Sequence, residues 1–180
     1  MSGSIARIRV IGLDPGLTHT GWGIVDVAGN RHSFVASNRI TGDAKQSLAH
    51  RLDYLYRELT KVILEWRPEI AAVEETVVNK NGASSLKLGH ARGVILLAAA
   101  HHGLTVSEYA SKTVKRALVG TGAADKIQLA AMVRHFLPTA GGLSADASDA
   151  LSVALCHAHH MATRERIDRA LSSDPSGPAR

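Results

Sequence analysis

The segment 7–27 constrains the fold of this chain more than any other stretch. Its first half, residues 8–13, is rich in the β-branched and aliphatic side chains of a buried strand, and Pro15 lacks the amide needed to continue a sheet ladder. The second half contains Gly21 and Gly23, and a glycine inside a strand indicates a bulge or a group that approaches the backbone closely. Because few residues separate the two halves, we expect an antiparallel hairpin.

Asp14 ends the first strand of this hairpin and is the first candidate functional residue. A carboxylate at the rim of a buried strand costs free energy unless it is paired, hydrogen-bonded or bound to a cation. The alternative is a local structural role, because aspartate often caps a turn before a Pro-Gly pair. The segment alone leaves both interpretations open.

The rest of the chain alternates between predicted helices and strands. Apolar residues recur at spacings of three and four along the helical segments, and Asp43 and Asp125 are each followed by a glutamine three residues later, as in capping boxes. We predict strands at 31–40, 70–75 and 104–109, and helices at 43–66, 84–102, 111–119, 125–136 and 144–163. A hairpin followed by such alternation predicts an α/β fold with a mixed sheet flanked by helices.

Length and composition narrow the class of protein. The 180 residues contain no internal repeat or linker and fit one domain, which we expect over residues 1–163, followed by a C-terminal tail over 164–180 that begins as a helical extension and becomes disordered. A net charge of +5 favours a polyanionic partner without identifying it. The single cysteine, Cys156, fits a reducing compartment, and the absence of a leader or spanning segment predicts a cytoplasmic protein with no membrane partner.

Acidic residues follow two of the predicted strands. Asp14 ends the first, and Glu74 and Glu75 end the strand at 70–75. If these strands are parallel neighbours, their ends lie on the same edge of the sheet, where open sheets form their sites. Asp146 and Asp149 share one face of the last predicted helix, although acids in a first turn also suit the helix dipole without any further role.

Convergence of these acids would need a compensating charge, because clustered carboxylates repel one another. Mg²⁺ prefers oxygen ligands, and two such ions about 3.5 to 4 Å apart can activate a water and stabilise the leaving oxygen of a phosphodiester. An acidic centre inside a basic protein therefore fits metal-dependent cleavage of nucleic acid.

Four motifs resemble the RuvC family of Holliday junction resolvases, in order and with the family's spacing from about residue 7 to about residue 160. They are Gly12-Leu-Asp-Pro-Gly-Leu-Thr-His-Thr-Gly-Trp-Gly23, Ala72-Val-Glu-Glu75, Leu86-Lys-Leu-Gly-His-Ala-Arg-Gly93 and Ala145-Asp-Ala-Ser-Asp-Ala-Leu151. The resemblance implies a ribonuclease-H-like fold with a mixed five-stranded sheet, a homodimer, two Mg²⁺ ions per subunit and symmetric nicking of four-way DNA junctions. It also implies a partnership with the branch-migration motor complex RuvA-RuvB.

The resemblance also assigns residues. The family's catalytic and metal-binding acids fall on Asp14, Glu74, Asp146 and Asp149. Its DNA-contacting lysines fall on Lys115 and Lys126, and Lys112 and Arg116 lie within a turn of Lys115. The alternative for these cations is an ordinary solvated face. Weaker candidates for contacts to the DNA backbone are Lys80, Lys87 and Arg92.

One catalytic position varies within the family, and at one other position this chain departs from many of its members. Some members have a histidine where this chain has Asp149, and many have an aromatic residue at the position of Val77, three residues after the strand acid, which the family uses to wedge into the junction. Two rival functions remain: a nucleotide-binding ATPase of the actin and sugar-kinase class, which would need a second lobe, and a junction-binding protein without catalysis, which would not need four acids.

Two further features allow structural alternatives. Gly89 and Gly93 leave one side of a helix nearly bare, which suits either a dimer interface or packing on the sheet. His157, His159 and His160 match no standard zinc spacing, and we expect surface or partly packed side chains.

Overall fold

The computed structural model describes residues 6–75 and 82–172. Five strands form one mixed sheet in the order β3-β2-β1-β4-β5. The strands β1 (Ile8–Asp14), β2 (His19–Ala28) and β3 (Arg31–Thr41) are antiparallel, whereas β4 (Ile70–Glu74) and β5 (Thr105–Tyr109) run parallel to β1. The predicted α/β class, the hairpin and the mixed five-stranded sheet are confirmed.

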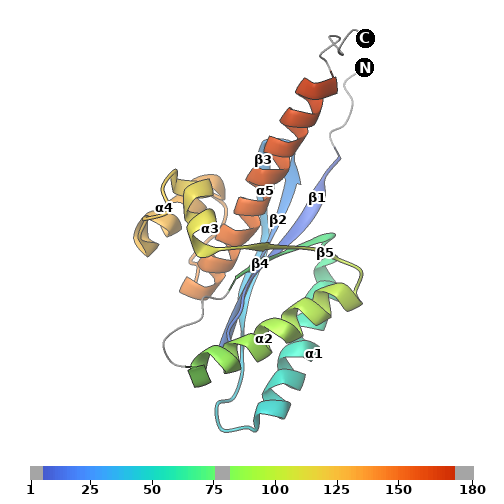
Figure 1. Ribbon diagram of the computed structural model, residues 1–180, viewed down its shortest axis with the longest axis vertical. Helices are drawn as coiled ribbons and strands as arrows, with labels where there is room; N and C mark the ends of the chain where they lie inside the picture. Colours follow the sequence, from blue (N-terminus) through green and yellow to red (C-terminus); the bar gives the residue numbers. More distant parts are fainter. Residues whose placement is uncertain (1–5, 76–81, 173–180) are drawn as a thin grey trace, which may run out of the picture.

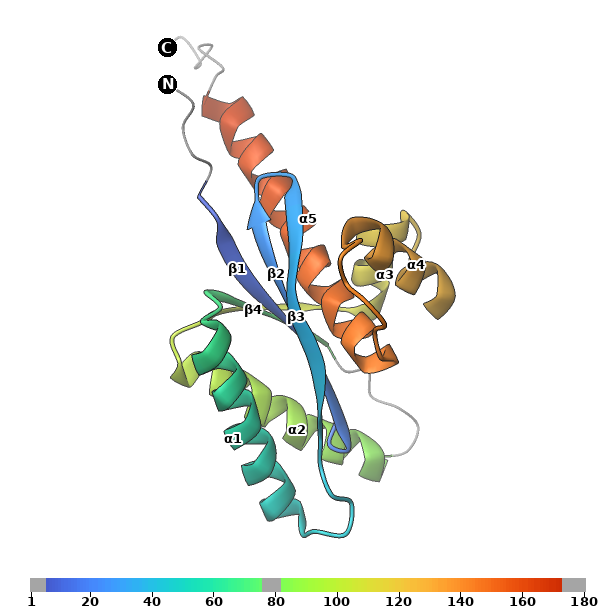
Figure 2. The same cartoon turned by 180° about the vertical axis from the view of Figure 1, so that it is seen from behind.

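Helices cover both faces of this sheet (Figure 1). On one face lie α1 (Leu48–Trp66) and α2 (Gly82–His101), and on the other lies the long α5 (Ala145–Ser172), with α3 (Ser111–Val119) and α4 (Lys126–Phe136) packed beside it. The view from behind shows the same two layers, with the edge strand β3 nearest the viewer (Figure 2).

Alternation along β1 divides its side chains between two cores. Val10 packs in the core under α5, whereas Ile11 and Leu13 pack in the core under α1 and α2, and all three are fully buried. A strand buried on both faces accounts for the nearly continuous apolar run in the sequence. The two cores hold β1 at the centre of the molecule, and its carboxyl end therefore has a fixed position.

The predicted start of the first helix is wrong. The first helix begins at Leu48 instead of residue 43, because Ser47 is its N-cap and accepts a hydrogen bond from the His50 amide. Asp43 instead accepts from the Lys45 amide in a local turn. The last helix continues beyond residue 163 to Ser172, which confirms the predicted helical extension, and residues 173–180 lie outside the described part of the chain.

The capping box at Asp125 and Gln128 is confirmed and starts α4 at Lys126. None of the helices in residues 6–75 and 82–172 is long and apolar enough to cross a membrane.

Candidate active site

Two parallel strands bring the first pair of acids together. In the register of β1 and β4, Leu13 lies opposite Val73, so the next residue of each strand, Asp14 and Glu74, ends it at the same edge of the sheet. Both carboxylates border a cavity of about 200 Å³. The neighbouring Glu75 is exposed, and its amide donates to the Tyr109 carbonyl. The preference for Glu74 over Glu75 therefore agrees with the position of each side chain.

Glycines in β1 and β2 bring the second pair of acids to this edge. A Cβ atom on Gly12 would overlap the Ala150 carbonyl oxygen, and one on Gly21 would overlap the Asp146 carbonyl oxygen. The backbone of α5 therefore lies directly on the strands, as the glycines predicted. The first turns of α5, which carry Asp146 and Asp149, are held against the end of β1.

The cavity is lined by side chains from five elements, β1, β4, α3, α4 and α5. Besides Asp14 and Glu74, its polar lining comprises Ser111 and Lys115 of α3, Lys126 of α4, and Asp149 and Ser152 of α5. Three of the four predicted acids thus meet Lys115 and Lys126 in one cavity, although Asp14 and Asp149 lie 135 positions apart in the sequence.

Burial and mutual repulsion perturb the acids. Burial, followed by the charges of Glu74, Asp149 and Asp146, raises the pKa of Asp14 to about 7, and Lys126 opposes this rise. Burial also raises the pKa of Glu74, against a hydrogen bond from Ser111 and the charges of Lys126 and Lys115. Negative charge at this edge is therefore incompletely compensated by the chain itself.

Two cations hold the α5 acids. The Lys126 ammonium lies 3.1 Å from Asp149 Oδ2, and this hydrogen bond raises the pKa of the lysine. The Arg39 guanidinium of β3 lies 3.4 Å from Asp146 Oδ2. Within the described residues, no three carboxyl, imidazole or thiol groups are arranged to hold a metal ion as they stand.

The donor set nevertheless fits a hard divalent cation. All four groups are carboxylates, the ligand type that Mg²⁺ prefers, and the raised pKa values of Asp14 and Glu74 are the electrostatic signature of acids that a cation would stabilise. Asp149 already borders the cavity with Asp14 and Glu74, whereas Asp146 pairs with Arg39 and is outside its lining.

The other predicted cations are divided between environments. Lys112 and Arg116 are exposed on α3, outside the acidic cavity, and Arg116 borders a second, larger one. Lys87 is exposed on α2, whereas Arg92 pairs with Glu108. Val77 and Lys80 lie outside the described residues.

Sequence reasoning missed Ser111 and Arg39. Ser111 starts α3 directly after β5, the strand next to β4, and this position was a usable signal. Arg39 sits on the edge strand β3, opposite Gly21, and nothing local in the sequence marks it.

The histidine prediction is partly wrong. His157 is only 7% exposed and lies 2.8 Å from the Tyr109 hydroxyl, because it falls on the inner face of α5. His159 is half-buried and His160 exposed, as expected.

A mixed sheet with acids at two adjacent strand ends and on a helix packed across them defines a protein of the ribonuclease-H-like class. The chain matches the family described as crossover junction endodeoxyribonuclease RuvC over residues 10–157. It belongs to this RuvC family, as the motifs predicted, and the predicted enzyme class, a nuclease that acts on DNA, is confirmed with it.

Individual relatives support the assignment. The crossover junction endodeoxyribonuclease RuvC of Acidiphilium cryptum is 54% identical over 164 residues, which cover 91% of this chain and 98% of the relative. The structure of Thermus thermophilus RuvC in complex with Holliday junction substrate matches with a TM-score of 0.81 and 31% identity, over 87% of this chain and 96% of that one. The yeast mitochondrial Holliday junction resolvase Ydc2 shares the fold, with a TM-score of 0.64 at 9% identity over 95% of this chain and 89% of that one.

Proposed function

We propose that this chain resolves four-way (Holliday) DNA junctions by symmetric paired nicks, in homologous recombination and DNA repair. The observation that carries the proposal is the cavity in which Asp14, Glu74 and Asp149 meet Lys115 and Lys126, in a chain of the RuvC family. The Thermus thermophilus relative, which is bound to a Holliday junction, supports the choice of substrate.

Asp14, Glu74, Asp146 and Asp149 are the residues that would hold Mg²⁺, with two ions per subunit. When bound, such ions supply an activated water and stabilise the leaving oxygen of the phosphodiester. Asp14 and Glu74 would hold the metal from two neighbouring strand ends, and Asp146 and Asp149 would hold it from α5, across the glycine contact. The products would be nicks with 5′-phosphate and 3′-hydroxyl ends, which a ligase can seal.

The lysines act on the phosphate. Lys115 and Lys126 reach the cavity from α3 and α4, where an ammonium group can contact the cleaved phosphate and stabilise its developing charge. Lys126 would exchange its contact with Asp149 for one with the phosphate. Lys112 and Arg116, exposed on α3, would contact the DNA backbone further from the cut.

Paired cuts require two sites, and we propose a homodimer formed through α2. Leu86, Gly89, Gly93 and Leu97 recur on one face of this helix at spacings of three and four. The two leucines are 64% and 61% exposed, and Cβ atoms on the two glycines would meet no described atom within 4 Å. This argues against the alternative in which the glycines pack on the sheet, and it leaves a face that another helix can approach closely.

Three further parts of the proposal concern the extent of the domain, the partner complex and the location in the cell. Residues 1–163 would act as one nuclease domain, since all five strands join one sheet, with residues 164–180 as an appended tail. The branch-migration complex RuvA-RuvB would be the partner on the junction. A cytoplasmic location is the third part, and it is supported by the bacterial relatives, because a bacterial chromosome lies in the cytoplasm.

The test compares cleavage of a fluorescently labelled synthetic four-way junction with cleavage of a linear duplex, in Mg²⁺ and in EDTA. The wild-type chain is expected to cut opposing strands of the junction only with Mg²⁺, giving ends that a ligase reseals. Asp14→Asn, which keeps the side-chain shape, is expected to bind the junction but to cut at least about 10³-fold more slowly. Equal cleavage by Asp14→Asn would show that the site is wrongly assigned, and junction binding without cleavage would support the non-catalytic rival.

A further inference from the structure

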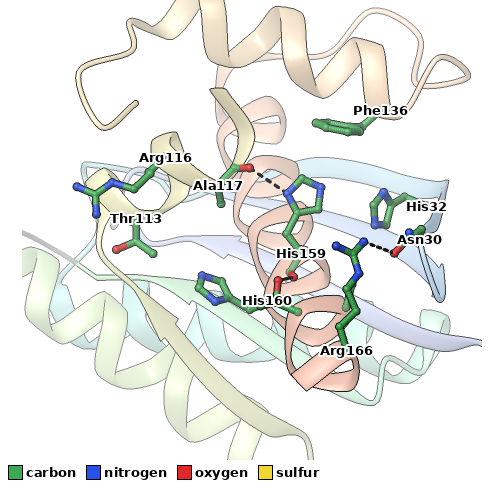
Figure 3. A pocket seen from close by; sticks show the side chains of 11 residues that line it. Asn30, His32, Thr113, Arg116, Ala117, Phe136, His159, His160 and Arg166 are labelled. Carbon is green, nitrogen blue, oxygen red and sulfur yellow. Dashed lines mark hydrogen bonds between the residues drawn. The ribbon is translucent and has the colours of Figure 1, made fainter. Parts of the chain in front are cut away.

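A second, larger cavity lies on the far side of α3 from the acids. It has a volume of about 570 Å³, within the range of small-molecule sites, and is bordered by the β2–β3 turn, α3, the end of α4 and the middle of α5. The residues that matter for its chemistry are Asn30, His32, Arg116, Phe136, His159 and Arg166 (Figure 3). None of the four acids of the candidate active site borders it. We call it the Arg-His pocket.

The Arg-His pocket is positively charged. Arg116 and Arg166 border it, and its lining contains no aspartate or glutamate. Figure 3 shows the two arginines on opposite sides, with His159 and His160 between them. Arg166 donates a hydrogen bond to Asn30 Oδ1 at 3.2 Å, which fixes the guanidinium at the rim, and neither arginine forms an ion pair in the described part of the chain. An anion would therefore be favoured here.

One wall of the pocket is aromatic. The Phe136 ring lies edge-on to His159, with centroids 5.0 Å apart, and edge-on to His32 at 6.0 Å, while His32 and His159 are 5.4 Å apart. Three rings gathered in this way offer a surface for a planar ligand.

The same wall has unused hydrogen-bonding capacity. His32 Nε2 is buried and has no hydrogen-bond partner, and burial lowers the pKa of this histidine, so its ring is neutral. His159 Nδ1 lies 3.0 Å from the Ala117 carbonyl, which can only accept, so Nδ1 carries a proton and donates this hydrogen bond. His32 Nε2 is shielded from solvent, so the polar edge of a ligand would reach it only after the ring turns toward the cavity, and a purely apolar ligand would leave it unsatisfied.

The charge and the aromatic wall of the pocket fit a nucleotide better than a divalent metal or a simple inorganic anion. A divalent metal could use the two imidazoles, but it would face two arginines with no acid in the lining. A simple inorganic anion would leave the aromatic wall unused. A nucleotide combines a planar base with polar edges and a phosphate, and a nucleotide within a strand has a phosphate on each side of its sugar, which matches arginines on opposite sides.

We propose that the Arg-His pocket binds one unpaired nucleotide, with its base against His32, Phe136 and His159 and its phosphates at Arg116 and Arg166. The position of the pocket connects it to the active site, because α3 presents Lys115 to the acidic cavity and the next residue, Arg116, to the pocket. A strand leaving the active site across α3 would deliver a nucleotide there. This inference goes beyond the proposed cleavage and does not depend on the acids.

The test measures binding to the full-length chain by calorimetry in EDTA. Without metal, the acidic site plays no part, so the result does not depend on whether the proposed cleavage is correct. The ligands are a single-stranded tetranucleotide, the same tetranucleotide with one abasic position, and a deoxynucleoside monophosphate. We expect the abasic ligand to bind at least about fivefold more weakly, because stacking on aromatic side chains favours an intact base. The histidine ring NMR signals of His32 and His159 should shift with the intact ligand.

Arg166→Gln is expected to weaken binding of the tetranucleotide at least about fivefold. The matched control is Arg164→Gln, which removes the same charge from an exposed position on α5 that does not border the pocket. Binding of the monophosphate as tight as that of the tetranucleotide would overturn the assignment to a nucleotide within a strand and identify a free nucleotide as the occupant. Equal affinity for the intact and abasic ligands, or equal effects of the two arginine substitutions, would overturn the proposal and indicate general attraction to a basic surface.

Discussion

Asp14 shows at the scale of a single residue how a fold can hold a carboxylate in an unfavourable state. The side chain follows four buried residues of β1 and lies close to three other acids, and the resulting pKa of about 7 means that deprotonation opposes folding at neutral pH. Such strain is expected where a cation or a proton is part of the function.

The pH dependence of stability follows from this pKa. In the unfolded chain the pKa of an aspartate is about 3.9. The raised folded-state pKa therefore adds stability that is full below about pH 4 and is lost as the pH rises through about 7. We expect the thermal midpoint of the wild-type chain in EDTA to fall relative to that of Asp14→Asn between pH 5 and pH 8.

Addition of Mg²⁺ at pH 8 provides the control. It is expected to raise the midpoint of the wild-type chain and to leave that of Asp14→Asn nearly unchanged, because binding to the folded state alone stabilises it. A difference between the two midpoints that stays constant across the pH range would contradict the assigned pKa.

Lys126 is the residue for a second prediction. Its ammonium group borders the acidic cavity and lies 3.1 Å from Asp149, so it is placed to contact the transferring phosphate. We expect Lys126→Ala to lower the cleavage rate at saturating junction by about 10²-fold, and Lys126→Arg to retain more of it. Lys112→Ala, which removes the same charge outside the cavity, should weaken junction binding without lowering that rate. Equal rate losses in Lys126→Ala and Lys112→Ala would exclude a specific role for Lys126.

At the scale of elements, the active site depends on how closely α5 approaches the sheet. A side chain on Gly12 or Gly21 would overlap the α5 backbone, and a side chain on Gly23 would overlap the Leu151 side chain. The same contact that packs the helix therefore places Asp146 and Asp149 opposite Asp14.

Substitution of one of these glycines tests the coupling between packing and site. In Gly21→Ala the new methyl group would overlap the Asp146 carbonyl oxygen, so α5 must shift. We expect a loss of about 1 to 3 kcal/mol in the free energy of unfolding, measured by urea denaturation, together with slower Mg²⁺-dependent cleavage. The comparison is Gly142→Ala, where a Cβ atom would meet nothing within 4 Å in the described structure. Unchanged stability in Gly21→Ala would show that the contact is less close than described.

Predictions from sequence succeeded where local signals and topology rules pointed to the same answer. Asp14 and Glu74 could be placed together because parallel neighbours end at one sheet edge, and the glycines of β2 indicated a close approach. The start of α1 could not be decided, because Asp43 and Ser47 both carry capping side chains. The hydrogen bond from the Gly42 amide to the Thr18 carbonyl holds the end of β3 beside the start of β2, and the helix starts only after it.

Contacts between distant segments explain the remaining misses. Arg39 meets Asp146 from 107 positions away, and no pattern around either residue marks the pair. His157 is buried because α5 continues along the sheet, and its burial depends on the exact face that α5 turns inward.

At the scale of the whole molecule, a chain with one active site must pair with a second copy to cut two strands. The exposed face of α2 with Leu86, Gly89, Gly93 and Leu97 is the surface that we expect to form the pair. A twofold axis would then direct two equivalent sites at opposing strands.

Leu97→Asp tests this surface. Size-exclusion chromatography with light scattering is expected to show a dimer for the wild-type chain and a monomer for Leu97→Asp. The folding of this variant should be unaffected, because the Leu97 side chain is already exposed. The monomer should nick junctions singly instead of in pairs. Leu64→Asp, at a leucine of α1 that is 59% exposed, is the matched control and should stay dimeric. A Leu97→Asp variant that remains dimeric would place the interface elsewhere.

The central claim is that acids from β1, β4 and α5 together bind divalent cations. Mn²⁺ binding followed by electron paramagnetic resonance, without DNA, tests it most directly, since free and bound Mn²⁺ give distinct signals. We expect the wild-type chain to bind Mn²⁺, Mg²⁺ to compete for the same site, and Asp14→Asn and Asp149→Asn each to weaken binding at least about tenfold. Equal Mn²⁺ binding by the wild-type chain and both variants would contradict the account.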